Sequence, residues 1–156
     1  MRDNGLIKIG DLARSSNLSE RSLRHYEELG IITPTRTKGG TRAYSEHDVE
    51  VAKLVQRMRD IGISLDQISS IATARADHET GAKSAKAVRQ QLSKLSENLM
   101  KMARMAIELE SEVTEVIMAV DECLSCENKA SSTGCPTCPM NEVSKESSLA
   151  DLIWRD

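Results

Sequence analysis

The stretch SERSLRHYEELG, residues 19–30, decides the fold of the N-terminal part of the chain. Ser19 is a residue type that caps helices, and Leu23 and Tyr26 follow at a three-residue spacing that places them on one helix face. Gly30 can adopt the left-handed conformation that ends a helix. The stretch therefore predicts a short, capped, amphipathic helix.

A first short helix is predicted just before this stretch. An apolar pattern opens after Gly10 and ends near Asn17, which leaves only a tight turn before the helix that Ser19 caps. Two short helices joined by such a turn form a helix-turn-helix, and its second helix is the one that enters the major groove of DNA.

A β-hairpin is predicted after the helix-turn-helix. Residues 35–44, TRTKGGTRAY, place two β-friendly arms around Gly39 and Gly40, a pair that favours a two-residue turn. A basic hairpin in this position is typical of the wing of a winged helix-turn-helix.

Two more helices are predicted near residues 46–60 and 65–75, separated by Gly62. Ser45 and Ser64 precede them, and each serine is followed three residues later by a side chain that can reach back to the cap's free amide.

The clearest periodicity lies between Val88 and Val120, where apolar residues recur in alternating steps of four and three. This heptad pattern predicts a helix of about 50 Å with a single apolar seam, which stays in water unless a second helix covers it. A core-facing helix usually has a wider apolar stripe, so packing back onto the N-terminal domain is the disfavoured alternative.

The nearest available partner for this helix is a second copy of the chain, so a homodimer is predicted. The spacing does not determine whether the two helices run parallel or antiparallel. The predicted dimer interface comprises Leu92, Leu95, Leu99, Met102, Ala106, Leu109 and Val113.

Composition and charge agree with a mainly α-helical DNA-binding protein. Among 156 residues, aromatic residues make up only 2%, so apolar volume comes from residues that favour helices. The net charge is -3. Between Arg14 and Arg42, however, the sequence contains six basic residues and three acidic ones, and phosphate binding depends on such a local excess of positive charge and not on the net charge of the chain. No apolar run is long enough to span a membrane and no secretory segment opens the chain, so a cytoplasmic location without a membrane partner is expected.

Several separated motifs resemble the MerR family of transcription regulators. They are IKIGDLA at residues 7–13, RHYEELGI at residues 24–31, Pro34 with Arg36, and RAY at residues 42–44. The resemblance covers about residues 6–75, and the long helix matches the family in architecture only.

The resemblance implies three segments: a winged helix-turn-helix DNA-binding domain at 5–75, a dimerisation helix at 80–121 that forms an antiparallel coiled coil, and a cysteine-rich tail at 122–156. Family members bind double-stranded promoter DNA with an over-long spacer and distort it, so that RNA polymerase can engage both promoter elements.

The candidate DNA-binding residues lie on the second helix and in the wing. Arg24 is the first choice, because arginine can bind phosphate or the acceptor edge of guanine. By resemblance, Tyr26 donates its hydroxyl to phosphate, whereas the alternative makes it an aromatic core residue. Wing residues would follow the DNA backbone, unless they form only a solvated basic hairpin. The full set is Arg21, Ser22, Arg24, His25, Tyr26, Arg36, Lys38, Arg42 and Tyr44.

Four cysteines follow the last heptad residue in the pattern C-x2-C-x8-C-x2-C: Cys123, Cys126, Cys135 and Cys138. Two such pairs can present four thiolates to one metal centre. The spacing favours zinc. The position resembles that of the [2Fe-2S] loop in SoxR-type members, but their second and third cysteines are separated by one residue only. Disulfides, free thiols or a redox-switched dithiol are the remaining alternatives, and a reducing compartment disfavours them.

These features together predict a DNA-binding regulator that responds to a metal ion or an oxidative signal at the cysteine loop. One alternative keeps the regulator but makes the zinc purely structural, with another inducer. Another is a coiled-coil adaptor for protein partners. An enzyme is not expected, because four cysteines close a tetrahedral ion and leave no position open for water.

Overall fold

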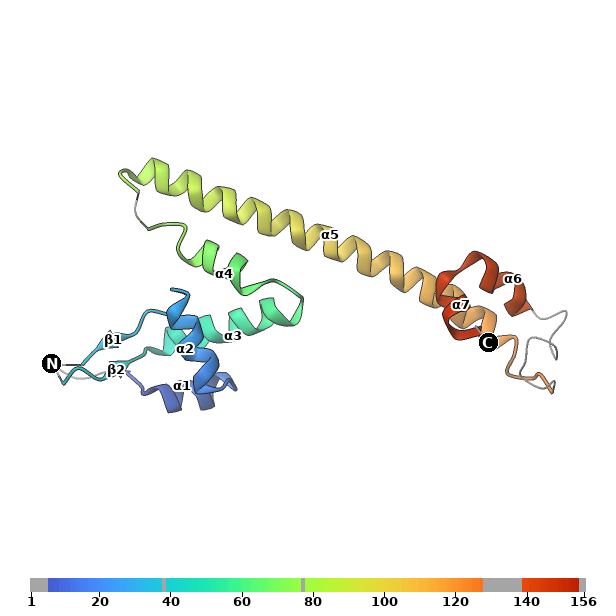
Figure 1. Cartoon of the computed structure of the whole chain (residues 1–156), viewed down its shortest axis with the longest axis horizontal. Coiled ribbons are helices and arrows are strands. Elements are labelled where there is room, and N and C mark those ends of the chain that lie inside the picture. The colour runs from blue at the N-terminus through green and yellow to red at the C-terminus, as the bar shows by residue number, and fades with distance from the viewer. Residues whose placement is uncertain (1–5, 38, 77, 128–138, 155–156) are drawn as a thin grey trace. The chain divides into compact units, whose positions relative to one another are not determined.

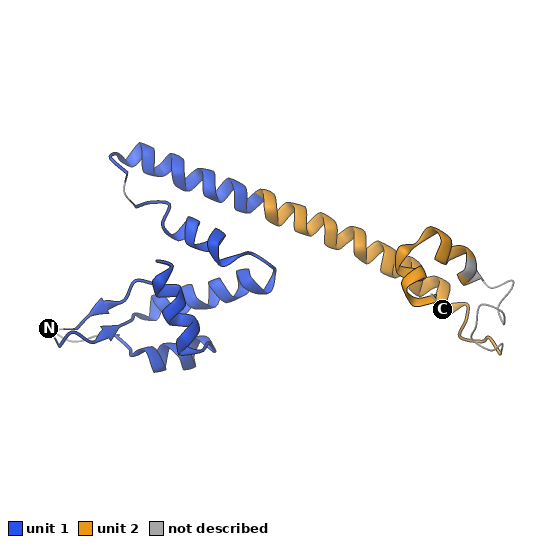
Figure 2. Ribbon diagram, viewed as in Figure 1, with its two compact units in different colours: residues 1–96 blue, residues 97–156 orange. Residues whose placement is uncertain are grey.

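The computed structural model describes residues 6–37, 39–76, 78–127 and 139–154. By their contacts the residues fall into two compact units, 1–96 and 97–156 (Figure 2). The boundary between these units lies inside one continuous helix and matches none of the predicted segment boundaries. The division into three segments therefore stays a prediction.

Helices α1 (Ile9–Ser16) and α2 (Glu20–Glu28) form the predicted helix-turn-helix (Figure 1). The Ser19 hydroxyl accepts a hydrogen bond from the backbone N–H of Ser22 at 3.0 Å, so the predicted cap is confirmed. Gly30 has a φ of 68°, the left-handed conformation that the sequence predicts at the end of this helix.

Strands β1 (Thr35–Arg36) and β2 (Arg42–Ala43) form the predicted antiparallel hairpin. The prediction of a two-residue turn is wrong. The register pairs Arg36 with Arg42, and the N–H of Thr37 donates to the carbonyl of Thr41, which leaves three residues in the turn. Gly40, with a φ of 78°, provides the left-handed residue that such three-residue turns require.

Helices α3 (Glu46–Asp60) and α4 (Leu65–Ala72) complete the N-terminal head. The hydroxyl oxygens of Ser45 and Ser64 both accept the predicted capping hydrogen bonds. The Ser69 hydroxyl donates to the carbonyl of Leu29 at 2.7 Å, so α4 is tied to the end of α2. The core of this head includes Leu12, Leu23, Tyr26, Ile32, Tyr44, Val55, Ile63 and Ile68.

The long helix α5 (Gly81–Asp121) confirms the helix predicted from the heptad pattern. Much of its apolar seam is open in the single chain: Leu92 is 49% exposed and Leu109 is 56% exposed. Only toward the end of the helix is a seam residue covered, since Val116 is 4% exposed.

Two short helices of the C-terminal segment, α6 (Pro139–Glu146) and α7 (Ser148–Trp154), were not predicted from the sequence. They pack against each other and against the end of α5, where Met140 and Ala150 are fully buried beside Val116. In the described part of the chain, no helix has the length and apolar content that a membrane crossing requires.

Candidate nucleic-acid interface and cysteine loop

The outer face of α2 carries the polar side chains that the sequence assigns to DNA. Arg21, Arg24 and His25 are exposed, and Ser22 is half-buried. Together with Glu28 they line a surface depression of about 540 Å³. The structure therefore gathers four of the predicted residues on one exposed face of the second helix.

Arg24 is held only loosely on this face. Its Nη2 lies 3.4 Å from Oε2 of Glu20, one turn earlier, and its side chain is 53% exposed. An exposed ion pair of this kind contributes little to stability. The guanidinium can therefore exchange this partner for a phosphate or a guanine edge.

A second depression extends this surface across α3 and shows residues that the sequence analysis missed. Gln56 and Arg59 of α3 line it together with Ser22, His25 and Tyr26 of α2. The available signal was a pair of basic residues in the last turn of α3, but sequence spacing alone does not show that this turn lies beside α2.

The wing contributes exposed cations. Arg36 is exposed and its Nη1 donates to the carbonyl of Gly40 at 3.2 Å. The side chain of Arg42 is 50% exposed. Lys38, which was also predicted to contact DNA, lies outside the described residues.

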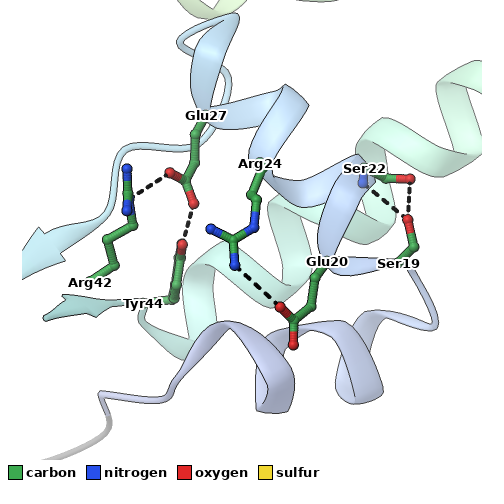
Figure 3. A network of polar contacts seen from close by, with 7 residues as sticks. All are labelled: Ser19, Glu20, Ser22, Arg24, Glu27, Arg42 and Tyr44. Carbon is green, nitrogen blue, oxygen red and sulfur yellow. Dashed lines mark hydrogen bonds and ion pairs between the residues drawn. The ribbon is translucent and has the colours of Figure 1, made fainter.

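Glu27 joins α2 to the wing (Figure 3). Its carboxylate accepts a hydrogen bond from the hydroxyl of Tyr44, and its Oε2 lies 3.1 Å from Nε of Arg42. The Glu27 side chain is only 12% exposed. A carboxylate that is buried to this extent requires hydrogen-bond or ion-pair partners. The wing supplies two of them, the Tyr44 hydroxyl and Nε of Arg42.

The placement of Tyr44 conflicts with its predicted role in contacting the DNA backbone. Its side chain is 1% exposed, and its hydroxyl already donates to Glu27. Burial, followed by the hydrogen bond to Glu27, raises the pKa of Tyr44 to about 12. The ring belongs to the core of the head, because a buried aromatic side chain usually satisfies its hydroxyl inside the protein.

Tyr26 is also a core residue, as the alternative interpretation held, since it is 4% exposed. Burial raises the pKa of its hydroxyl above the ordinary value, while the nearby Arg59 acts in the opposite direction. Because Tyr26 also lines the depression across α2 and α3, its contact with phosphate stays a prediction.

The raised pKa of Tyr44 predicts a specific pH dependence of stability. The folded state favours the neutral phenol, so the stabilisation is complete below pH 10.0 and is lost as the pH rises toward about 12. The difference in free energy of unfolding between the wild type and Tyr44→Phe should therefore shrink over this range. Denaturant unfolding at stepped pH, with phenolate absorbance of the folded chain, measures it. Ionisation of Tyr44 at its ordinary pKa would contradict the buried hydrogen bond.

The first cysteine pair lies just after α5. Cys123 is half-buried against the cluster formed by Val116 and Met140, whereas Cys126 is exposed. The backbone N–H of Cys126 donates to the carbonyl of Cys123 at 3.0 Å, so the pair lies in a tight turn. Cys135 and Cys138 lie outside the described residues, and the four-thiolate site stays a prediction.

The described residues define a class of protein, a winged helix-turn-helix protein whose head is followed by a long helix. Residues 7–74 match the family model of the MerR HTH family regulatory proteins. The N-terminal head is therefore similar to the MerR family.

Two relatives agree with this similarity. The heavy metal-dependent transcription regulator 2 of Rhizobium meliloti is 34% identical over 83 residues, which cover 53% of this chain and 56% of that protein. The mercuric resistance operon regulatory protein of Bacillus cereus is 35% identical over 66 residues, which cover 42% of this chain and 50% of that protein. The match thus spans about half the length of these relatives. Both relatives are named as regulators.

The fold is also similar to that of a solved structure. HiNmlR, a MerR family regulator lacking the sensor domain and bound to promoter DNA, superposes with a TM-score of 0.53 and 18% sequence identity. The likeness covers 78% of this chain and 94% of that chain. At this identity it supports the fold.

Proposed function

We propose that this chain is a homodimeric, cytoplasmic transcription regulator that binds promoter DNA and changes transcription in response to a metal ion or an oxidative signal. The observation that carries the proposal is the exposed face of α2, where Arg21, Arg24 and His25 gather on a helix-turn-helix of the MerR family. In such a motif the second helix lies in the major groove.

The proposal assigns different roles to the basic residues. Arg24 and its neighbours on α2 contact bases and phosphates, whereas Arg36, Lys38 and Arg42 of the wing follow the backbone. Two heads held apart by paired α5 helices reach successive grooves and distort the DNA between them, which lets RNA polymerase engage the promoter.

The cysteine loop is proposed to receive the signal. Thiolates bind soft and borderline metal ions, and the two relatives are named for heavy metals and for mercury resistance. Zinc at a four-thiolate site is preferred and a [2Fe-2S] cluster is the second choice. A purely structural zinc with another inducer remains the alternative for this loop.

Arg24→Ala tests the DNA interface. A duplex is first selected from a random-sequence DNA pool with the wild-type protein. Arg24→Ala should lower the affinity for that duplex about 10- to 100-fold for each of the two bound heads, since a good arginine contact to guanine contributes about 1–3 kcal/mol. Gel-shift titration measures the affinity, and footprinting should show protection of two half-sites with an altered spacer between them.

Arg104→Ala is the matched control, because it removes the same side chain from an exposed position on α5. It should bind the selected duplex as the wild type does. If the wild type binds random duplexes as tightly as the selected one at moderate salt, the proposed sequence-specific regulator is refuted. Recovery of protein partners in place of DNA would then favour the coiled-coil adaptor.

A further inference from the structure

Glu27 is an acidic residue on the helix assigned to DNA, and neither its charge nor its sequence position suggests a role in DNA binding. Its carboxylate nevertheless has two donors from the second arm of the wing, the Tyr44 hydroxyl and Nε of Arg42 (Figure 3). At 12% exposure the Glu27 side chain lies almost entirely inside this contact.

The ion pair between Arg42 and Glu27 leaves most of the Arg42 guanidinium available for a further hydrogen-bond acceptor. A guanidinium is planar and carries five N–H donors, so anchoring it through Nε restricts the plane while both Nη groups keep their protons for another acceptor. The Arg42 side chain is 50% exposed, so solvent or a ligand can reach it. An arginine restrained in this way loses less conformational entropy when it binds a phosphate.

Resting on the proposed function, we infer that Glu27 is a positioning residue for DNA binding: it anchors Arg42 of the wing so that the Arg42 Nη groups bind a DNA phosphate in register with α2. The acceptor chemistry is a phosphodiester oxygen of duplex DNA. The contact also links the wing to the helix that reads the groove, so both parts of the head meet the DNA as one unit.

Simple electrostatics and the positioning role predict opposite results. A carboxylate near DNA repels phosphate, so its removal should raise the affinity if charge alone matters. If Glu27 positions Arg42, its removal should lower the affinity, although the protein becomes less acidic. The sign of the change therefore separates the two explanations.

The experiment compares Glu27→Ala, Arg42→Ala and the double variant on the duplex selected with the wild type, over a range of salt concentrations. Arg42→Ala should reduce the slope of log affinity against log salt by about 1.8 for the bound dimer, because each of the two heads loses one phosphate contact and each contact contributes about 0.9. Glu27→Ala should reduce the slope by a similar amount, and the double variant should bind no more weakly than Arg42→Ala.

Glu27→Gln keeps an oxygen acceptor and should recover part of the lost affinity, which also covers the case in which Glu27→Ala does not fold. Glu50→Ala is the charge-matched control: it removes an exposed carboxylate of α3, and its salt slope should stay at the wild-type value.

Equal or higher affinity in Glu27→Ala and Glu27→Gln, or losses that add in the double variant, would overturn the inference. A wild-type slope in Arg42→Ala would overturn it as well. These outcomes leave the proposed function intact as long as the wild type still prefers its selected duplex to random DNA. A wild type with no such preference would refute the proposed function itself.

Discussion

Replacing Leu99 by glutamate is expected to leave the chain monomeric at micromolar concentration and to lower its affinity for the selected duplex about 100- to 1,000-fold. Leu99 lies close to the middle of α5 and is 37% exposed in the single chain. A central position faces the middle of the partner helix in both parallel and antiparallel pairs, so the effect does not depend on helix direction.

Two free-energy costs of dimerisation add in the Leu99→Glu variant. Each protomer loses the burial of a leucine, about 1.5–3 kcal/mol, and gains a carboxylate that the interface would have to desolvate without a partner. A monomer then presents one head at a time, and the gain from binding two half-sites together is lost. Sedimentation equilibrium measures the mass and gel-shift titration measures the affinity.

Ser111→Glu is the control for this experiment. Ser111 follows Leu109 by two residues, which places it opposite the seam in the heptad pattern, and it is exposed. The substitution adds the same charge to the same helix and should leave both mass and affinity unchanged. A Leu99→Glu chain that stays dimeric with full affinity would refute the seam as the dimer interface.

Cys126→Ser is expected to have the second large effect, on metal content. A four-thiolate ion in a protein is bound with about 10–16 kcal/mol, and a serine hydroxyl is a poor substitute for one thiolate. The metal content should fall from about one centre per chain to less than about a tenth of that after dialysis against a chelator. Metal and sulfide analysis of anaerobically purified protein measures it.

The wild type in this experiment also identifies the centre. A colourless protein with about one zinc per chain supports the single tetrahedral ion, whereas a brown protein with iron and sulfide supports the cluster. Ser125→Ala changes the same turn without removing a thiol and should retain the metal. A metal-free wild type, or full metal content in Cys126→Ser, would contradict a four-thiolate site.

Much of the head could be predicted because its signals are local. The Ser19 cap, the left-handed Gly30 and the Ser45 cap act within four residues of chain, and all three occur as predicted. The wing turn was predicted with one residue too few, because Gly39 and Gly40 suit two turn types and the strand register decides between them.

The candidate site could be predicted only for residues whose exposure follows from their spacing along a single amphipathic helix. Arg21, Arg24 and His25 lie on the polar face of α2 as expected. The position of Arg59 beside α2 depends on how α3 crosses the head, which no local pattern shows.

The C-terminal helices illustrate the same limit. Both α6 and α7 are shorter than the length at which an isolated helix is stable in water. They form where Met140 and Ala150 can be buried against the end of α5, and only packing provides that surface.

The amino-acid sequence by itself determined the helix-turn-helix, its caps and the heptad seam of α5, because each depends on residues close together in the chain. Only the tertiary structure decided that Tyr44 is a core residue and that Glu27 connects the reading helix to the wing. Glu27 and Tyr44 are 17 residues apart, and burial and hydrogen bonding at that separation are properties of the folded surface around them.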